Sequence, residues 1–80
     1  MSFTTAAYVI LKSEGRPLSA RELVSKAIYV GLLNTQGKTP HETMWASLYL
    51  ENKRRKQRRQ TTRFVQLENG YWSLTKWESE

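Results

Sequence analysis

The densest group of chemically active side chains in this sequence is a basic run in its last third. Of the thirteen lysines and arginines, seven lie between residues 53 and 63, and the other six face seven glutamates in the rest of the chain. The run consists of Lys53, Arg54, Arg55, Lys56, Arg58, Arg59 and Arg63. Like charges this close repel one another, so a folded surface that keeps them together is typical of a patch that meets a polyanion. We interpret the run as a phosphate-contacting edge; a solvated charged loop and a nuclear-localisation-like segment are the alternatives.

A second candidate for phosphate binding is the start of the helix that precedes this run. Thr39 suits the N-cap, Pro40 suits the first helical position, and Glu42 completes a capping box with Thr39. Lys38 stands just outside the positive end of this helix, where a cation and free backbone amides together form an anion site. A cap with a purely structural role is an equal alternative.

Side chains in the first turns of the same helix could reach the edges of bases. His41 could contact phosphate or a base, although a solvated first-turn histidine is the favoured interpretation. Thr43 and Ser47 could face a groove, but both residue types are common on any helix surface. Trp45 could stack on a base, yet we expect it in the core.

Two short motifs resemble catalytic sites without completing them. The Gly-Lys-Thr turn at residues 37–39 lacks the earlier glycine of a P-loop, because Leu32 occupies that position and no strand precedes it. Residues 51–53, Glu-Asn-Lys, match half of a restriction-nuclease site, but the chain has no aspartate and metal-dependent cleavage needs converging carboxylates. With no cysteine and with His41 as the single histidine, a zinc site is not expected either. We predict no enzyme activity, no catalytic residue, no metal and no cofactor.

Eighty residues predict one small domain with a modest core, and capping signals divide it into helices. The sequence Ser19-Ala20-Arg21-Glu22 is a capping box, and Gly31 suits the end of the helix that it begins. The first expected helix is capped by Thr4 or Thr5 and ends at about Ser13, and the second runs from Ala20 to about Val30. The third runs from Pro40 to roughly Glu51 or on into the basic run, and residues 53–62 should form a frayed helix end or a mobile loop. Leu18 can form a short extended bridge between the first two helices.

Apolar spacing indicates which faces of these helices are buried. The stripe of the second helix should contain Leu23, Val24, Ala27, Ile28 and Val30. The stripe of the third should contain Met44, Leu48 and either Trp45 or Tyr49. Leu32 and Leu33 should anchor the connecting loop to the core.

The C-terminal part predicts a β-hairpin. Asn69-Gly70 is a strong signal for a two-residue type I′ turn. The resulting register pairs Glu68 with Tyr71, Leu67 with Trp72, Gln66 with Ser73 and Val65 with Leu74, and it places Val65, Leu67, Trp72 and Leu74 on one apolar face. Phe64 falls on the opposite face in this register, and a bulge or its place at the start of the strand is the alternative that would let it reach the core. Trp77 follows in a short tail and could fold back over the helices.

Three helices followed by a hairpin give a mainly α fold with a small β-hairpin wing. This order is that of a winged helix-turn-helix, here expected as a single domain over residues 1–80, either alone or as a module of a larger protein. The chain resembles the HARE-type helix-turn-helix family. The matching residues are Ala6-Ala7, Val9, Leu11, Gly15-Arg16-Pro17-Leu18, Glu22-Leu23, Ala27, Gly31-Leu32, Gly37-Lys38-Thr39-Pro40, Thr43-Met44, Leu48-Tyr49, Arg63-Phe64-Val65 and Gly70-Tyr71-Trp72-Ser73-Leu74.

The resemblance implies a DNA-binding module of the kind found in restriction endonucleases, chromatin regulators and the delta subunit of bacterial RNA polymerase. The residues themselves favour double-stranded DNA, with the third helix at the major groove and the cations on the phosphates. The ending at residues 72–77 is most similar to the delta subunit, which favours a protein-interaction module as the first alternative, although that subunit is acidic and this chain is basic. RNA binding through the arginine-rich run is the second alternative.

The predicted location follows from segments that the sequence lacks. No apolar run approaches the roughly 20 residues of a membrane span, and no signal peptide is visible. We therefore expect no membrane association and a location in the cytoplasm or nucleoid, or in the nucleus of a eukaryote.

Overall fold

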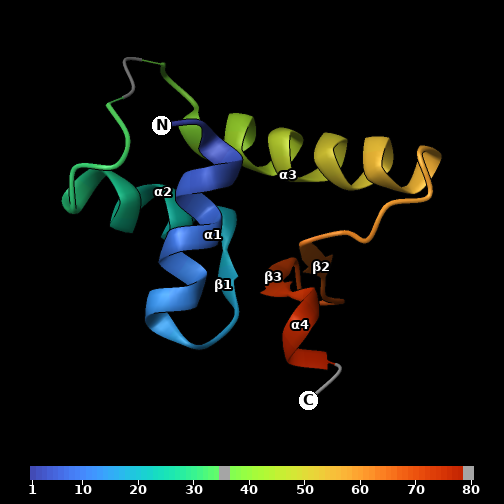
Figure 1. Ribbon diagram of the computed structural model, residues 1–80. Helices are drawn as coiled ribbons and strands as arrows, with labels where there is room; N and C mark the ends of the chain where they lie inside the picture. Colours follow the sequence, from blue (N-terminus) through green and yellow to red (C-terminus); the bar gives the residue numbers. More distant parts are fainter. Residues whose placement is uncertain (35–36, 79–80) are drawn as a thin grey trace.

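Three helices occupy most of residues 3–57, and a small sheet combines a short strand between the first two helices with a hairpin near the C-terminus (Figure 1). The computed structural model describes residues 1–34 and 37–78. Its elements are α1 (Phe3–Glu14), β1 (Leu18–Ser19), α2 (Ala20–Tyr29), α3 (Pro40–Gln57), β2 (Phe64–Gln66), β3 (Tyr71–Leu74) and α4 (Thr75–Glu78). In Figure 1, α3 runs along one side of the molecule, with α1, α2 and β1 beneath its first half and β2 and β3 further along the helix. This arrangement is the predicted winged helix-turn-helix.

The first two helices begin with serine caps. The Ser19 hydroxyl accepts from the Glu22 amide at 3.1 Å while the Glu22 carboxylate accepts from the Ser19 amide at 3.2 Å, which confirms the predicted capping box. The prediction of Thr4 or Thr5 as the first cap is wrong, because the Ser2 hydroxyl accepts from the Thr5 amide and α1 already begins at Phe3. Ser2 has the extended backbone of a good cap, which places its oxygen over the first turn.

Helix α3 begins at Pro40 as predicted, but without the expected capping box. Thr39 is the N-cap residue, and its side chain makes no cap hydrogen bond. Its backbone explains the difference, since ψ is 62° at Thr39 but 161° and 162° at the caps Ser2 and Ser19. The Thr39 carbonyl, rather than its hydroxyl, accepts from the Glu42 amide at 3.1 Å.

The buried face of α2 is narrower than the sequence suggested. Leu23, Val24 and Ala27 are buried, whereas Ile28 is 44% exposed and Val30 is 57% exposed. Ile28 lies at the edge of the stripe, and Val30 follows the last helical residue, so neither belongs to the buried face of α2. Leu33 returns the chain to the core as expected, where its amide donates to the Ala27 carbonyl at 3.2 Å.

The wing is a three-stranded antiparallel sheet in the order β1-β3-β2. Leu18 pairs with Trp72, so the predicted extended bridge between the first two helices is β1, which joins the hairpin as an additional strand of the sheet. The hairpin register differs by one residue from the prediction: Phe64 pairs with Leu74, Val65 with Ser73 and Gln66 with Trp72. This slip exchanges the two faces of β2, so Phe64 lies in the core and Val65 is only half-buried.

The hairpin loop has three residues instead of two. The Gly70 amide donates to the Leu67 carbonyl at 3.0 Å, and the Leu67 amide donates to the Tyr71 carbonyl at 2.8 Å. Gly70 has φ +81°, the left-handed conformation that closes a type I turn with one extra residue. Asn-Gly therefore marks the turn correctly, but Gly70 serves as the bulge residue instead of the second turn residue.

The core lies between the three helices and the inner face of the sheet. Its largest fully buried side chains are Trp72, Phe64, Leu11, Leu18, Leu23, Met44, Leu48 and Leu74. Trp77 packs partly buried against this cluster, as predicted. The core therefore holds α3 by the side that carries Met44 and Leu48, and leaves the opposite side facing outward.

Candidate nucleic-acid interface

The first half of the basic run is helical. Helix α3 continues to Gln57, which agrees with the predicted extension into the basic run, whereas the prediction of a frayed or mobile segment is wrong for residues 53–57. Lys53, Arg54 and Lys56 are exposed on the helix, and Figure 1 shows this half of α3 extending past α1 and α2. Cations at this end also oppose the negative end of the helix dipole, which helps to explain why so charged a segment stays helical.

The helix ends in a Schellman turn with an arginine at the left-handed position. The Gln60 amide donates to the Arg55 carbonyl at 2.8 Å and the Arg59 amide to the Lys56 carbonyl at 3.1 Å. Arg59 has φ +56°, and it is the one non-glycine residue with positive φ among the described residues. Glycine is the usual residue at this position, so the backbone of Arg59 is strained, and the position carries a positive charge instead.

Two of the seven cations are held by a single carboxylate. Arg63 donates to Glu51 through two nitrogens, at 2.6 Å and 3.1 Å, and Arg55 Nε lies 3.7 Å from Glu51 Oε2. The Arg63 guanidinium also lies over the rings of Tyr8 and Phe64, at 5.4 Å and 5.3 Å from their centres. The hydrogen bond to Glu51 raises the pKa of Arg63, against the effect of its burial. Phosphate contact by these two arginines stays a prediction.

The other five cations of the run remain available to a partner. Their side chains form no ion pair with any residue in the described ranges 1–34 and 37–78, and all five are exposed. These residues are Lys53, Arg54, Lys56, Arg58 and Arg59. A concentration of uncompensated charge on one helix end creates a local positive field that attracts polyanions.

The candidate residues at the start of α3 lie far from this cluster. Lys38, Thr39 and Thr43 are exposed, while His41 is half-buried with its Nε2 3.5 Å from Arg21 Nη2. At about 1.5 Å per residue, the two ends of α3 are roughly 25 Å apart, so the structure does not bring both groups to one point. The predicted anion site also has fewer backbone amides to offer, because Pro40 has no N–H and the Glu42 amide already donates to the Thr39 carbonyl.

Ser47 lies with part of the basic run. It lines a shallow hollow of about 360 Å³ on the side of α3 that faces the start of α1. Arg54 and Arg58 line the same hollow, together with Thr4. A hydroxyl and two guanidinium groups at one place form a suitable set of donors for a phosphate oxygen.

Trp45 was expected in the core, but the structure places it at the surface in an aromatic pair with Tyr49. Trp45 and Tyr49 are 40% and 45% exposed, and their rings stack with centres 5.3 Å apart at 8°. Trp45 also meets the buried Trp72 edge to face at 6.3 Å. Their spacing of four residues on a helix is the signal that could have revealed the stack.

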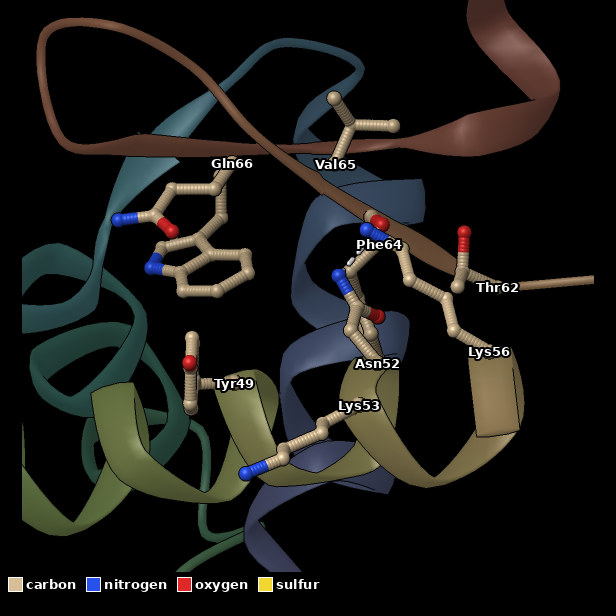
Figure 2. Close-up of a pocket in the computed structure, with 9 residues that line it drawn as sticks. Tyr49, Asn52, Lys53, Lys56, Thr62, Phe64, Val65 and Gln66 are labelled. Carbon is tan, nitrogen blue, oxygen red and sulfur yellow. Dashed lines mark hydrogen bonds between the residues drawn. The ribbon is translucent and has the colours of Figure 1, made fainter. Parts of the chain in front are cut away.

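A groove of about 430 Å³ separates this face of α3 from the wing (Figure 2). Tyr49, Asn52, Lys53 and Lys56 line it from the helix, and residues 64–66 and Trp72 line it from the sheet. In Figure 2 the side chains of Tyr49, Asn52 and Lys56 rise from α3 toward β2. Asn52 Nδ2 donates to the Phe64 carbonyl at 2.9 Å and so links the helix to the wing.

No helix in the described part of the chain has both the length and the apolar character needed to cross a membrane. Within the same residues, no group of three histidine, aspartate or glutamate side chains is placed to hold a metal ion.

The fold and this surface define a winged helix-turn-helix domain with a cationic third helix. Residues 1–77 of the chain match the HARE-HTH family, whose description as a helix-turn-helix (HTH) domain includes ASXL and restriction endonuclease. The chain therefore belongs to the HARE-HTH family, whose members are DNA-binding helix-turn-helix domains and not catalytic ones. No curated protein and no solved structure matches it.

Proposed function

We propose that this domain binds double-stranded DNA, with α3 at the major groove and its basic end on the phosphate backbone. The observation that carries the proposal is the set of five exposed cations without an ion-pair partner in the described residues, which a continuous helix and its Schellman turn hold in place. A rigid array loses less conformational entropy on binding than a flexible tail would. The setting would be transcription, chromatin or DNA restriction and modification.

The shape of the molecule supports this docking. The outer side of α3 faces away from α1, α2 and the sheet, so a duplex can approach it without a rearrangement (Figure 1). Thr43 and the first turn, with Lys38, Thr39 and His41, would meet one part of the site, and the basic end would meet phosphates roughly 25 Å away. Phosphate contacts set the position of a protein on DNA, whereas base contacts set its sequence preference.

The salt dependence of duplex binding tests this proposal. Each neutralised phosphate contributes about −0.9 to the slope of log affinity against log salt. If four of the five available cations engage, the slope should be roughly −3 to −4. Titration of a labelled 20-base-pair duplex between low and physiological salt measures it, with a hairpin RNA as competitor. A flat titration would refute binding through this patch, and stronger competition by the RNA would assign the patch to RNA.

A protein-interaction role is the second candidate, and an exposed apolar patch favours it. Ile28, Tyr29 and Val30 are exposed together at the end of α2, and Tyr29 is 91% exposed. Exposed apolar groups of this kind are typical of interfaces. A pull-down of RNA polymerase core with the wild-type domain and with Tyr29→Ser tests it. Retention that depends on Tyr29, without measurable duplex binding, would favour this role over DNA binding.

A further inference from the structure

Two of the residues that line the groove between α3 and the wing carry a buried polar atom without a hydrogen-bond partner. Asn52 Oδ1 and Trp72 Nε1 are both buried, and neither makes a hydrogen bond with a described residue. The orientation of the Asn52 amide is determined, because Nδ2 must face the Phe64 carbonyl, which can only accept. One unpaired acceptor and one unpaired donor therefore belong to residues that line the same groove. Buried polar groups without partners are rare in folded proteins and call for an explanation.

The aromatic stack leaves a ring face free beside this groove. Trp72, Trp45 and Tyr49 form a continuous series of ring contacts from the core to the surface. Trp45 covers one face of the Tyr49 ring, and Tyr49 also lines the groove. A further planar ring in the groove could therefore continue the stack on the second face of Tyr49. Stacking on aromatic side chains is the usual way in which proteins hold unpaired bases.

Two of the available cations stand at the same groove. Lys53 and Lys56 line it, and neither has an ion-pair partner among the described residues. A volume of about 430 Å³ falls within the range of small-ligand pockets. An aromatic face and two ammonium groups match the base and the phosphate of one nucleotide, and the unpaired donor and acceptor lie buried beneath them.

We infer that this groove holds a single unpaired nucleotide, extruded from the DNA on which α3 docks. The base would stack on Tyr49, and Lys53 and Lys56 would hold its phosphate. Asn52 Oδ1 and Trp72 Nε1 are buried in the free domain, so they would pair with the base only after a side-chain shift at the floor of the groove. The inference rests on the proposed DNA binding and deepens it, because it makes an unstacked base part of the preferred site. Extrusion costs least where a base is already unpaired, so a duplex with a bulge should be the best ligand.

Three duplexes of 20 base pairs test the inference. The first is fully paired, the second carries one unpaired thymidine at its centre, and the third carries an abasic nucleotide at that place. The thymidine and abasic bulges share the same sugar–phosphate backbone and differ only in the base, so their difference reports the contribution of the base. We expect the thymidine bulge to bind roughly fivefold or more tightly than the abasic bulge, as stacking of one base implies.

Substitutions on α3 locate the effect. Tyr49→Ala should abolish the preference for the thymidine bulge, whereas Tyr49→Phe should retain it. Leu50→Ala is the matched control, since Leu50 is an equally exposed apolar residue on α3 that lies on the other flank of the helix. Because both side chains are exposed, the melting temperatures of these variants should stay close to that of the wild type.

The possible results separate the inference from the proposed function. Equal affinity for the two bulged duplexes, or a preference that survives Tyr49→Ala, would overturn the nucleotide pocket and leave duplex binding intact. In that case the groove would belong to a protein side chain or to the architecture of the wing. Absence of binding to all three duplexes would overturn both.

Discussion

Arg59 offers the sharpest test of how this surface combines stability with binding. It occupies the left-handed position of the Schellman turn that ends α3, with φ +56°. The left-handed conformation destabilises the folded state by roughly 1–2 kcal/mol when the residue is not glycine. Glycine relieves this strain but loses about 0.5–1 kcal/mol more backbone entropy on folding. Arg59→Gly should therefore stabilise the domain by about 0.5–1 kcal/mol. For a domain of this size, the melting temperature should rise by roughly 2–8 °C.

The same substitution should weaken DNA binding. Arg59 is exposed and has no ion-pair partner in the described residues, so its charge is available to a phosphate. Loss of one phosphate contact should lower the magnitude of the salt slope by about 0.9. Stability and affinity are thus expected to change in opposite directions, which a general loss of structure could not produce.

Arg59→Ala is the control, because alanine removes the charge but keeps the strained backbone. Its affinity should match that of Arg59→Gly, while its melting temperature should stay near that of the wild type. Thermal unfolding followed by circular dichroism, together with fluorescence anisotropy on a labelled duplex, measures both quantities. If the glycine and alanine variants melt at the same temperature, the left-handed strain at residue 59 is refuted. If the glycine variant binds as tightly as the wild type, Arg59 does not contact DNA.

Three further predictions concern the rest of the surface and the helix starts. In the first, alanine replaces four exposed cations, namely Lys53, Arg54, Arg58 and Arg59. Binding to all duplex sequences should weaken alike with little change in melting temperature, and a large loss of stability would show a structural role. Glu51→Gln should cost about 1–3 kcal/mol in urea unfolding, because it weakens the two charged hydrogen bonds from Arg63, and an unchanged midpoint would contradict that ion pair. Ser19→Ala should cost about 1 kcal/mol, whereas Thr39→Ala should stay within roughly 0.5 kcal/mol, since only the first hydroxyl makes a cap bond; equal losses would contradict the observed caps.

Helix starts and the cationic run could be read from the sequence because both depend on near neighbours. The capping box at Ser19 needs only residues three apart, and it is present as predicted. The position of the basic patch follows directly from the sequence, the order of helices and hairpin predicted the fold class, and the motif residues indicated the family. Local signals were less reliable where a competing neighbour was close, as with Ser2, which caps α1 in place of Thr4 or Thr5.

The tertiary structure decided which side chains are free to act. The sequence could not show that Glu51 holds Arg63, because the two side chains meet only when the wing folds back on α3. The contact of Glu51 with Arg55 is instead a local pair four residues apart on the helix. The exposure of Trp45 likewise depends on Trp72, which fills the space beneath it.

Hairpin register is the clearest case of a choice made by packing. The Asn-Gly turn is compatible with loops of two or three residues, and each loop places a different face of β2 on the core. Burial of the larger Phe64 side chain favours the three-residue loop, with Val65 moved to the half-buried face. Turn chemistry is local and was visible in the sequence, whereas the gain from burying Phe64 exists only against α1, α3 and the sheet.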